Sequence, residues 1–292
     1  MSPDAGLAVA LRDAETVLAD AGVASPRVDA ELLAAHLLGV SRGRVRALAI
    51  TGADAPAGLT DLVRERARRV PLQHLTGTAS FRTVELAVGP GVFVPRPETE
   101  SVVQVALDRI RAAHLDAPLV ADLGTGSGAI AAAVAAEVPG ASVVAVELSD
   151  LALAWAERNL AGTGVELVAG DFRTALAGRE GTFDVVVTNP PYVPPDAVPV
   201  DPEVAEHDPP EALYGGDRGG LEHPAAAAVA AAAALRPGGF LVMEHAEQQG
   251  AAVERILAGA GFVDVAAHSD LTGRRRATSG VLPPDQNGVP RA

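Results

Sequence analysis

From Glu98 onward, short apolar segments alternate with glycine-rich turns and longer alanine- or leucine-rich segments, and this alternation constrains the fold most strongly. The short segments have the length of strands, and the longer ones have the period of helices. Expected strands are residues 119–121, 142–146, 165–168, 183–188 and 240–243, and expected helices are residues 129–137, 151–160, 225–235 and 251–258. Strands that alternate with helices favour a doubly wound, mostly parallel sheet, so the predicted fold class is α/β.

The first part of the chain, to about Val70, has a different pattern. Apolar side chains recur at helical spacing over residues 7–18, 28–37 and 59–67, without the alternation of a strand. Ser25-Pro26 is typical of a helix start, because proline at the first helical position has no N–H to leave unpaired. The pattern predicts a small helical domain.

A β-hairpin is expected between the two parts. Residues 81–88 alternate apolar and polar side chains, Gly89-Pro90-Gly91 turns the chain, and residues 92–94 resume the extended pattern. The expected organisation is a helical domain over residues 1–76, a hairpin linker over 77–97, an α/β domain over 98–282 and a loose tail over 283–292.

The composition excludes several classes of chemistry. The chain has no cysteine and no lysine, so all 23 basic residues are arginine. Thiolate zinc sites, cysteine nucleophiles, a P-loop lysine and a Schiff-base lysine are therefore excluded. The formal net charge of −14 opposes binding to a phosphate backbone. No signal peptide is evident, and the longest apolar run, residues 225–235, is shorter than the ~20 residues that span a bilayer. We therefore expect a cytoplasmic protein with no membrane segment.

A glycine-rich turn joins the first expected strand of the α/β part to its helix. It reads Asp122-Leu123-Gly124-Thr125-Gly126-Ser127-Gly128, and its glycines let a ligand approach the main chain. Alone it also fits a bare turn or a dinucleotide site, although its glycines lack the wider gap of pyrophosphate binders. Glu147 ends the next expected strand, where nucleotide-binding α/β folds place an acid that binds ribose hydroxyls. The turn and Glu147 together predict a ribose-containing ligand.

Two further motifs follow later strands. Asp171 and Phe172 can hold an adenine by its amino group and its face, or they can form an ordinary turn with a capping aspartate. Asn189-Pro190-Pro191-Tyr192 follows residues 183–188. Its prolines fix φ at about −65° and cannot continue a sheet ladder. This sequence is a structural Asx-Pro turn or a rigid polar clamp for a planar amide or amine. The carboxyl ends of parallel strands meet at one edge, so we expect these motifs in one crevice.

These motifs resemble those of class I S-adenosylmethionine-dependent methyltransferases that methylate a planar nitrogen. Asn-Pro-Pro-Tyr is shared by adenine-N6 DNA, guanine-N2 RNA and glutamine-N5 protein methyltransferases. Other segments resemble the PrmC/HemK family, which modifies the glutamine of the Gly-Gly-Gln motif in peptide chain release factors. These segments are residues 71–77, Phe81, and residues 94–100, 209–216, 219–221, 235–239 and 270–274. The chain departs from the family pattern at Glu147, Phe172 and Ala246, where aspartate, tryptophan and glycine are more usual.

The resemblance implies a class I, Rossmann-like methyltransferase fold and methyl transfer from S-adenosylmethionine to that glutamine's N5, in support of translation termination. The implied cofactor-binding residues are Asp122, Gly124, Thr125, Gly126, Ser127, Gly128, Glu147, Asp171, Phe172 and Asn189. The implied substrate-binding residues are Asn189, Pro190, Pro191 and Tyr192, of which Asn189, Pro190 and Tyr192 are expected to be catalytic. Arg96 and Glu98 either border the pocket or cap a helix. The helical domain is expected to contact the release factor, and we expect a monomer that uses no metal.

Two other interpretations remain open. A DNA or RNA exocyclic-amine methyltransferase would carry the same clamp, but the charge of −14 and the lack of a lysine- or aromatic-rich insert disfavour direct nucleic-acid binding. A cofactor-binding scaffold without catalysis would not need an intact clamp. The arginines at 64, 66, 68 and 69 are interpreted separately, as a solvated helix face or as a surface for an acidic partner.

Overall fold

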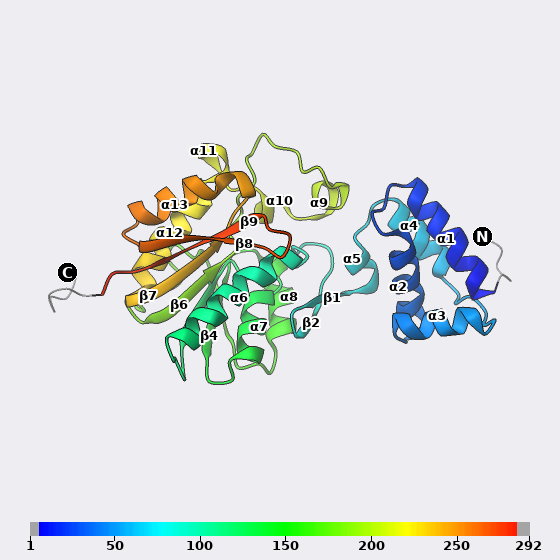
Figure 1. Ribbon diagram of the computed structural model, residues 1–292, viewed down its shortest axis with the longest axis horizontal. Helices are drawn as coiled ribbons and strands as arrows, with labels where there is room; N and C mark the ends of the chain where they lie inside the picture. The colour runs from blue at the N-terminus through cyan, green and yellow to red at the C-terminus, as the bar shows by residue number, and fades with distance from the viewer. Residues whose placement is uncertain (1–5, 285–292) are drawn as a thin grey trace. The chain divides into compact units, whose positions relative to one another are not determined.

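The computed structural model describes residues 6–284, which form two compact units. One unit comprises residues 6–78 and 199–207, and the other comprises residues 79–198 and 208–284 (Figure 1). From residue 285 on, the expected tail lies outside the described residues. Among the residues that are described, no helix has both the length and the apolar character needed to cross a membrane.

The first unit is helical, as the spacing of apolar residues predicts. Its helices are α1 (Leu7–Asp20), α2 (Pro26–Leu38), α3 (Arg42–Ile50), α4 (Leu59–Ala67), α5 (Leu72–Thr76) and the later α9 (Pro202–His207). Leu11, Leu18, Leu33 and Val63 are among its fully buried apolar side chains. Ser25 is the N-cap of α2 and Pro26 its first residue.

The interpretation of the α4 arginines as a solvated face is wrong for Arg66 and Arg69. Arg66 is only 7% exposed; its Nε donates to Asp29 at 2.8 Å and its Nη1 lies 2.6 Å from Glu203 on α9. Arg69 also binds Glu203. A buried guanidinium needs such partners because desolvating an unpaired charge is costly. Arg64 and the C-cap residue Arg68 make exposed ion pairs with Asp61 and Glu65 of α4.

The second unit is built on a seven-stranded sheet in the order β5-β4-β3-β6-β7-β9-β8. Its strands are β3 (Leu119–Leu123), β4 (Ser142–Glu147), β5 (Glu166–Ala169), β6 (Phe183–Thr188), β7 (Leu235–Glu244), β8 (Val263–Ser269) and β9 (Arg275–Val281). The first five pair in parallel, whereas β9 is antiparallel to β7 and to β8. The doubly wound, mostly parallel sheet is thereby confirmed.

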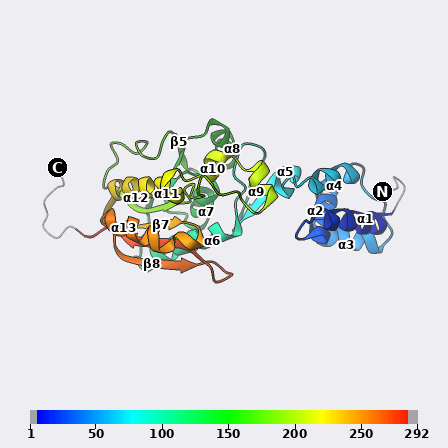
Figure 2. The ribbon, with the colours of Figure 1, turned by 90° about the horizontal axis from the view of Figure 1, so that it is seen from above.

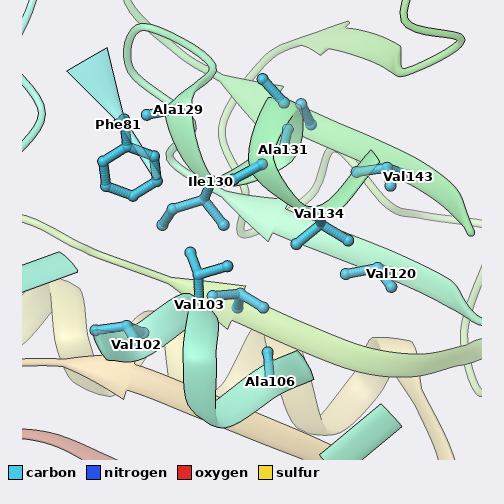
Figure 3. Close-up of a cluster of buried hydrophobic side chains, with 14 of the residues drawn as sticks. Phe81, Val102, Val103, Ala106, Val120, Ala129, Ile130, Ala131, Val134 and Val143 are labelled. Carbon is cyan, nitrogen blue, oxygen red and sulfur yellow. The ribbon is translucent and has the colours of Figure 1, made fainter. Parts of the chain in front are cut away.

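Helices cover both faces of the sheet. They are α6 (Pro97–Ala112), α7 (Ala129–Glu137) and α8 (Asp150–Leu160) on one face, and α12 (Glu222–Ala234) and α13 (Gly250–Gly259) on the other. Successive strand residues point to opposite faces: Val120 packs with the first group (Figure 3), and Ala121 with the second. The helices α12 and α13 lie side by side (Figure 2). Both faces are therefore apolar, which explains why the strands lack polar alternation.

The hairpin is present, but the expected position of its turn is wrong. Its strands are β1 (Thr78–Phe81) and β2 (Val84–Ala87), and the chain turns at Arg82, whose φ is +49°. Arg82 is held there by Glu137 and by Glu100, which accepts a hydrogen bond from its backbone N–H at 3.1 Å. Residues 92–94 form no strand. The short elements α10 (Pro210–Leu213) and α11 (Asp217–Gly220) and the strands β8 and β9 have no counterpart in the sequence prediction.

Candidate functional site

A cavity of about 340 Å³ lies at the carboxyl ends of β3, β4, β5 and β6. This is the edge at which open α/β sheets bind ligands. Ten of the predicted site residues line it: Gly124, Thr125, Gly126, Ser127, Glu147, Asp171, Phe172, Asn189, Pro191 and Tyr192. The structure does not place Asp122, Gly128, Pro190, Arg96 or Glu98 among the lining residues.

The glycine-rich turn between β3 and α7 requires left-handed backbone conformations. Gly124, Gly126 and Gly128 have φ of +79°, +58° and +84°, values at which a side chain is strained. The turn is tied to the end of β4, because the N–H groups of Gly124 and Thr125 both donate to the Val146 carbonyl at 2.9 Å. The alternating glycine spacing is therefore a requirement of this turn.

Glu147 is joined to the same turn. Its Oε2 accepts from the Gly126 N–H at 2.7 Å, and its Oε1 accepts from the N–H groups of Leu148 and Ser149 at 2.9 and 2.8 Å. Three backbone donors hold one carboxylate at the cavity wall, which fixes its oxygens in place. Such a carboxylate can accept hydrogen bonds from vicinal hydroxyls.

Asp122 lies behind the turn and is fully buried. Its Oδ2 accepts from the Thr125 hydroxyl at 2.5 Å and from the Ala131 N–H at 3.2 Å. Burial raises the pKa of Asp122 to about 7, although the bond from Thr125 opposes the rise. Asp122 thus acts on the cavity through the shape of the turn.

The far wall of the cavity carries Asp171 and Phe172. Asp171 accepts from the Arg173 N–H at 2.9 Å and pairs with its guanidinium at 3.0 Å. That guanidinium also lies 5.3 Å from the centre of the Phe172 ring. The Asp171 side chain therefore closes an Asx turn and caps no helix, because residues 172–177 form turns, and both side chains border the cavity.

Asn189 and Tyr192 line the cavity after β6, beside the glycine-rich turn and on the side away from Glu147 and Asp171. Asn189 directs its Nδ2 to the Thr99 hydroxyl oxygen at 3.3 Å. The Tyr192 hydroxyl donates to Glu244 Oε1 at 3.2 Å, and burial raises the pKa of Tyr192 well above its usual range. Pro190 is buried beside them. With Nδ2 engaged by Thr99, the Asn189 Oδ1 atom receives no hydrogen bond from the described residues and can accept one from a ligand.

The backbone after Tyr192 is packed against the segment that contains α11. Gln249 Nε2 donates to the Tyr192 carbonyl at 2.8 Å and to the Gly219 carbonyl at 3.0 Å. A Cβ atom on Gly220 would lie 2.2 Å from the Tyr192 carbonyl oxygen, closer than any real contact. The glycines of this segment therefore let it close on the clamp.

The segment before α6 borders the cavity through other side chains than the two expected. Arg96 is the N-cap residue of α6, pairs with Asp208 and lies over the Phe93 ring at 5.0 Å. The lining residues here are Gly91, Val92, Phe93 and Pro95, together with Thr99 in the first turn of α6. Leu148, Leu213 and His223 also line the cavity without having been predicted. No local pattern marks them, because distant parts of the chain bring them together.

Comparisons with known proteins show which sequences this chain is similar to. Residues 9–77 match the family model described as PrmC N-terminal domain, and residues 83–204 match the one described as Methyltransferase small domain. The chain is 50% identical to a release factor glutamine methyltransferase of Streptomyces coelicolor, over 89% of this chain and 92% of that protein. It is 48% identical to the protein of the same name from Mycolicibacterium smegmatis, over 92% and 95% of the two chains. For the Deinococcus radiodurans protein of that name, identity is 42% over 91% and 95%.

Proposed function

The chain belongs to the family of release factor glutamine methyltransferases, and we propose from this that it methylates the side-chain amide nitrogen, N5, of the glutamine in the Gly-Gly-Gln motif of a peptide chain release factor. The methyl donor is S-adenosylmethionine. The observation that carries the proposal is one cavity in which the glycine-rich turn lies between Glu147 on one side and Asn189 with Tyr192 on the other.

The donor end of the cavity fits a nucleoside with a charged tail. When bound, S-adenosylmethionine supplies an activated methyl group on a sulfonium. Glu147 offers carboxylate oxygens for the ribose hydroxyls, and Phe172 offers a ring face for the adenine. The tight turn at Gly124 and Gly126 brings main chain to the cavity wall without side chains in the way.

The acceptor end suits a primary amide. The substrate NH₂ has two donors, and Asn189 Oδ1 with the Pro190 carbonyl can accept both. A glutamine amide nitrogen is a poor nucleophile, so its position relative to the methyl group decides the rate. Tyr192 shields the amide from water, and acceptors already in place stabilise the positive charge that develops on nitrogen. The proton leaves once the nitrogen is cationic, so no strong base is required beforehand.

Replacing Asn189 with alanine tests the assignment. We expect kcat to fall about 10²- to 10³-fold, the usual cost of removing one preorganised polar group that stabilises transition-state charge. Affinity for S-adenosylmethionine, measured by calorimetry, should stay nearly unchanged. The readout is transfer of labelled methyl groups to a release factor, and a release factor with its motif glutamine replaced is the substrate control. Normal turnover by Asn189→Ala would contradict the proposed role of the clamp.

A nucleic-acid acceptor is the alternative, because exocyclic amines also fit a polar clamp. DNA and RNA are therefore tested in parallel with the release factor. Label in the release factor that disappears when its motif glutamine is changed would support the proposal, and label in DNA or RNA alone would reverse it. Release factors act in translation, so we also propose that this enzyme works in the cytoplasm, as a monomer whose helical unit contacts the release factor.

A further inference from the structure

Glu244 is a buried carboxyl directly behind the clamp. It ends β7, where Met243 pairs with Thr188, so it lies beside Asn189 at the carboxyl edge of the sheet. The residue is 2% exposed and does not line the cavity. A carboxyl in such a place is costly unless hydrogen bonds compensate it. The mechanism above gives it no role.

One hydroxyl group of the clamp region bonds to this carboxyl, and a second acts on it from nearby. Tyr192 donates to Oε1 at 3.2 Å, whereas the buried Oε2 has no hydrogen-bond partner among the described residues. The hydroxyl of Thr99 favours the ionised form of this carboxyl. Burial raises the pKa of Glu244 to about 7, and these two hydroxyls oppose the rise. Glu98 on α6 and Arg276 on β9 also face it, the first raising and the second lowering the pKa.

The polarity of this network decides how Asn189 is oriented. An ionised carboxylate only accepts hydrogen bonds, so hydroxyls beside it turn their hydrogens toward it. The Thr99 oxygen is then left as an acceptor, and it receives Asn189 Nδ2 at 3.3 Å. The amide of an asparagine can flip, and its neighbours decide which end faces where. With Nδ2 engaged by Thr99, Oδ1 faces the cavity.

We infer that Thr99 and Glu244 are positioning residues for methyl transfer: the buried carboxylate orients the Thr99 and Tyr192 hydroxyls, and Thr99 in turn holds Asn189 with its oxygen toward the acceptor amide. This inference rests on the proposed function. A protonated Glu244 can donate a hydrogen bond to Thr99, which releases the Thr99 hydrogen to point at Asn189. The amide then turns its NH₂ toward the substrate NH₂, and two donors face each other.

The pH dependence of kcat follows from this arrangement. The ionised form of Glu244 is the active one, so kcat should fall as the pH drops through about 7. Glu244→Gln keeps the shape but can donate at every pH. We expect its kcat to be about 10- to 100-fold lower, the usual scale for a misplaced reacting group, with the acid limb of the wild-type profile lost. Calorimetry should show an unchanged affinity for S-adenosylmethionine.

A pair of substitutions at Thr99 separates positioning from packing. Thr99→Val keeps the shape and removes the hydroxyl, whereas Thr99→Ser keeps the hydroxyl and removes a methyl group. Only Thr99→Val should lower kcat, and thermal melts with calorimetry show that both variants fold and bind cofactor. Equal kcat for the two Thr99 variants, or an intact acid limb in Glu244→Gln, would overturn this inference. Methylation of the release factor by the wild-type enzyme would still support the proposed function in that case. A wild-type enzyme that leaves the release factor glutamine unmodified overturns both.

Discussion

Asp122 is a buried carboxyl that supports the glycine-rich turn from behind the cavity. Because Asp122 stands in the glycine-rich motif, it was predicted to be a cofactor-binding residue. In the structure its carboxyl is fully buried and holds Thr125 and the start of α7. Thr99 and Glu244 were not predicted as site residues, because the sequence does not show which distant residues they contact. Their roles depend on a contact between segments about 90 and 50 residues away from Asn189 and Tyr192, which no local pattern encodes.

The buried carboxyl of Asp122 should make stability depend on pH. Burial raises its pKa from 3.8 to about 7, so the folded state holds the proton more tightly than the unfolded chain. Its contribution to stability is full below pH 4 and is lost as the pH rises through 7. Urea denaturation should show that wild type loses stability relative to Asp122→Asn across this window, by at most about 1.4 kcal/mol per pH unit.

The exposed Asp116 supplies the control for that measurement. Asp116→Asn makes the same change of charge without burial, so an effect that comes from net charge alone would appear in both variants. If the stabilities of wild type and Asp122→Asn changed in parallel from pH 4 to pH 8, this result would contradict the account of Asp122 as a carboxyl that burial keeps neutral.

Whole elements were predictable where burial leaves a simple pattern. The strand at Phe183–Thr188 and the helix at Ala129–Glu137 have the bounds that the sequence predicts. Both are largely apolar, the strand is followed by Asn189-Pro190, and the helix lies between Gly128 and Pro139. The strands β8 and β9 carry polar and charged residues, and Arg275 begins β9. They lie at one side of the sheet, where β8 is the last strand, and such strands need no apolar run.

The turn containing Gly219 and Gly220 gives a prediction about an element that supports the clamp. Both glycines have left-handed backbone, with φ of +68° and +80°. A Cβ on Gly219 meets nothing within 4 Å, whereas one on Gly220 lies 2.2 Å from the Tyr192 carbonyl. Both alanine variants should lose about 1–2 kcal/mol of stability from backbone strain. Only Gly220→Ala should also displace the clamp and lower kcat, and equal kcat in the two variants would argue against this contact as a support.

At the scale of the whole molecule, the chain returns to its first unit after the clamp. Residues 199–207, which include α9, belong to the helical unit although they follow β6 in sequence. Glu203 on α9 joins Arg66 and Arg69, residues more than 130 positions earlier. No periodicity predicts a pairing over this distance in the sequence. Arg66 and Arg69 were therefore interpreted from the sequence as part of a solvated helix face.

This ion-pair cluster should stabilise the helical unit. Burial raises the pKa of Glu203, but hydrogen bonds from Arg69 and Arg66 outweigh it and hold the pKa well below its usual range. Glu203→Gln leaves buried guanidinium groups partly uncompensated and should cost about 3 kcal/mol at pH 7. The lowered pKa means that this difference shrinks as the pH falls below about 4. Asp61→Asn removes an exposed pair with Arg64 and should cost less than about 1 kcal/mol. Urea denaturation, followed by amide exchange in α2 and α4, measures the loss of stability in each variant. Equal losses in Glu203→Gln and Asp61→Asn would mean that these charges do not hold α9.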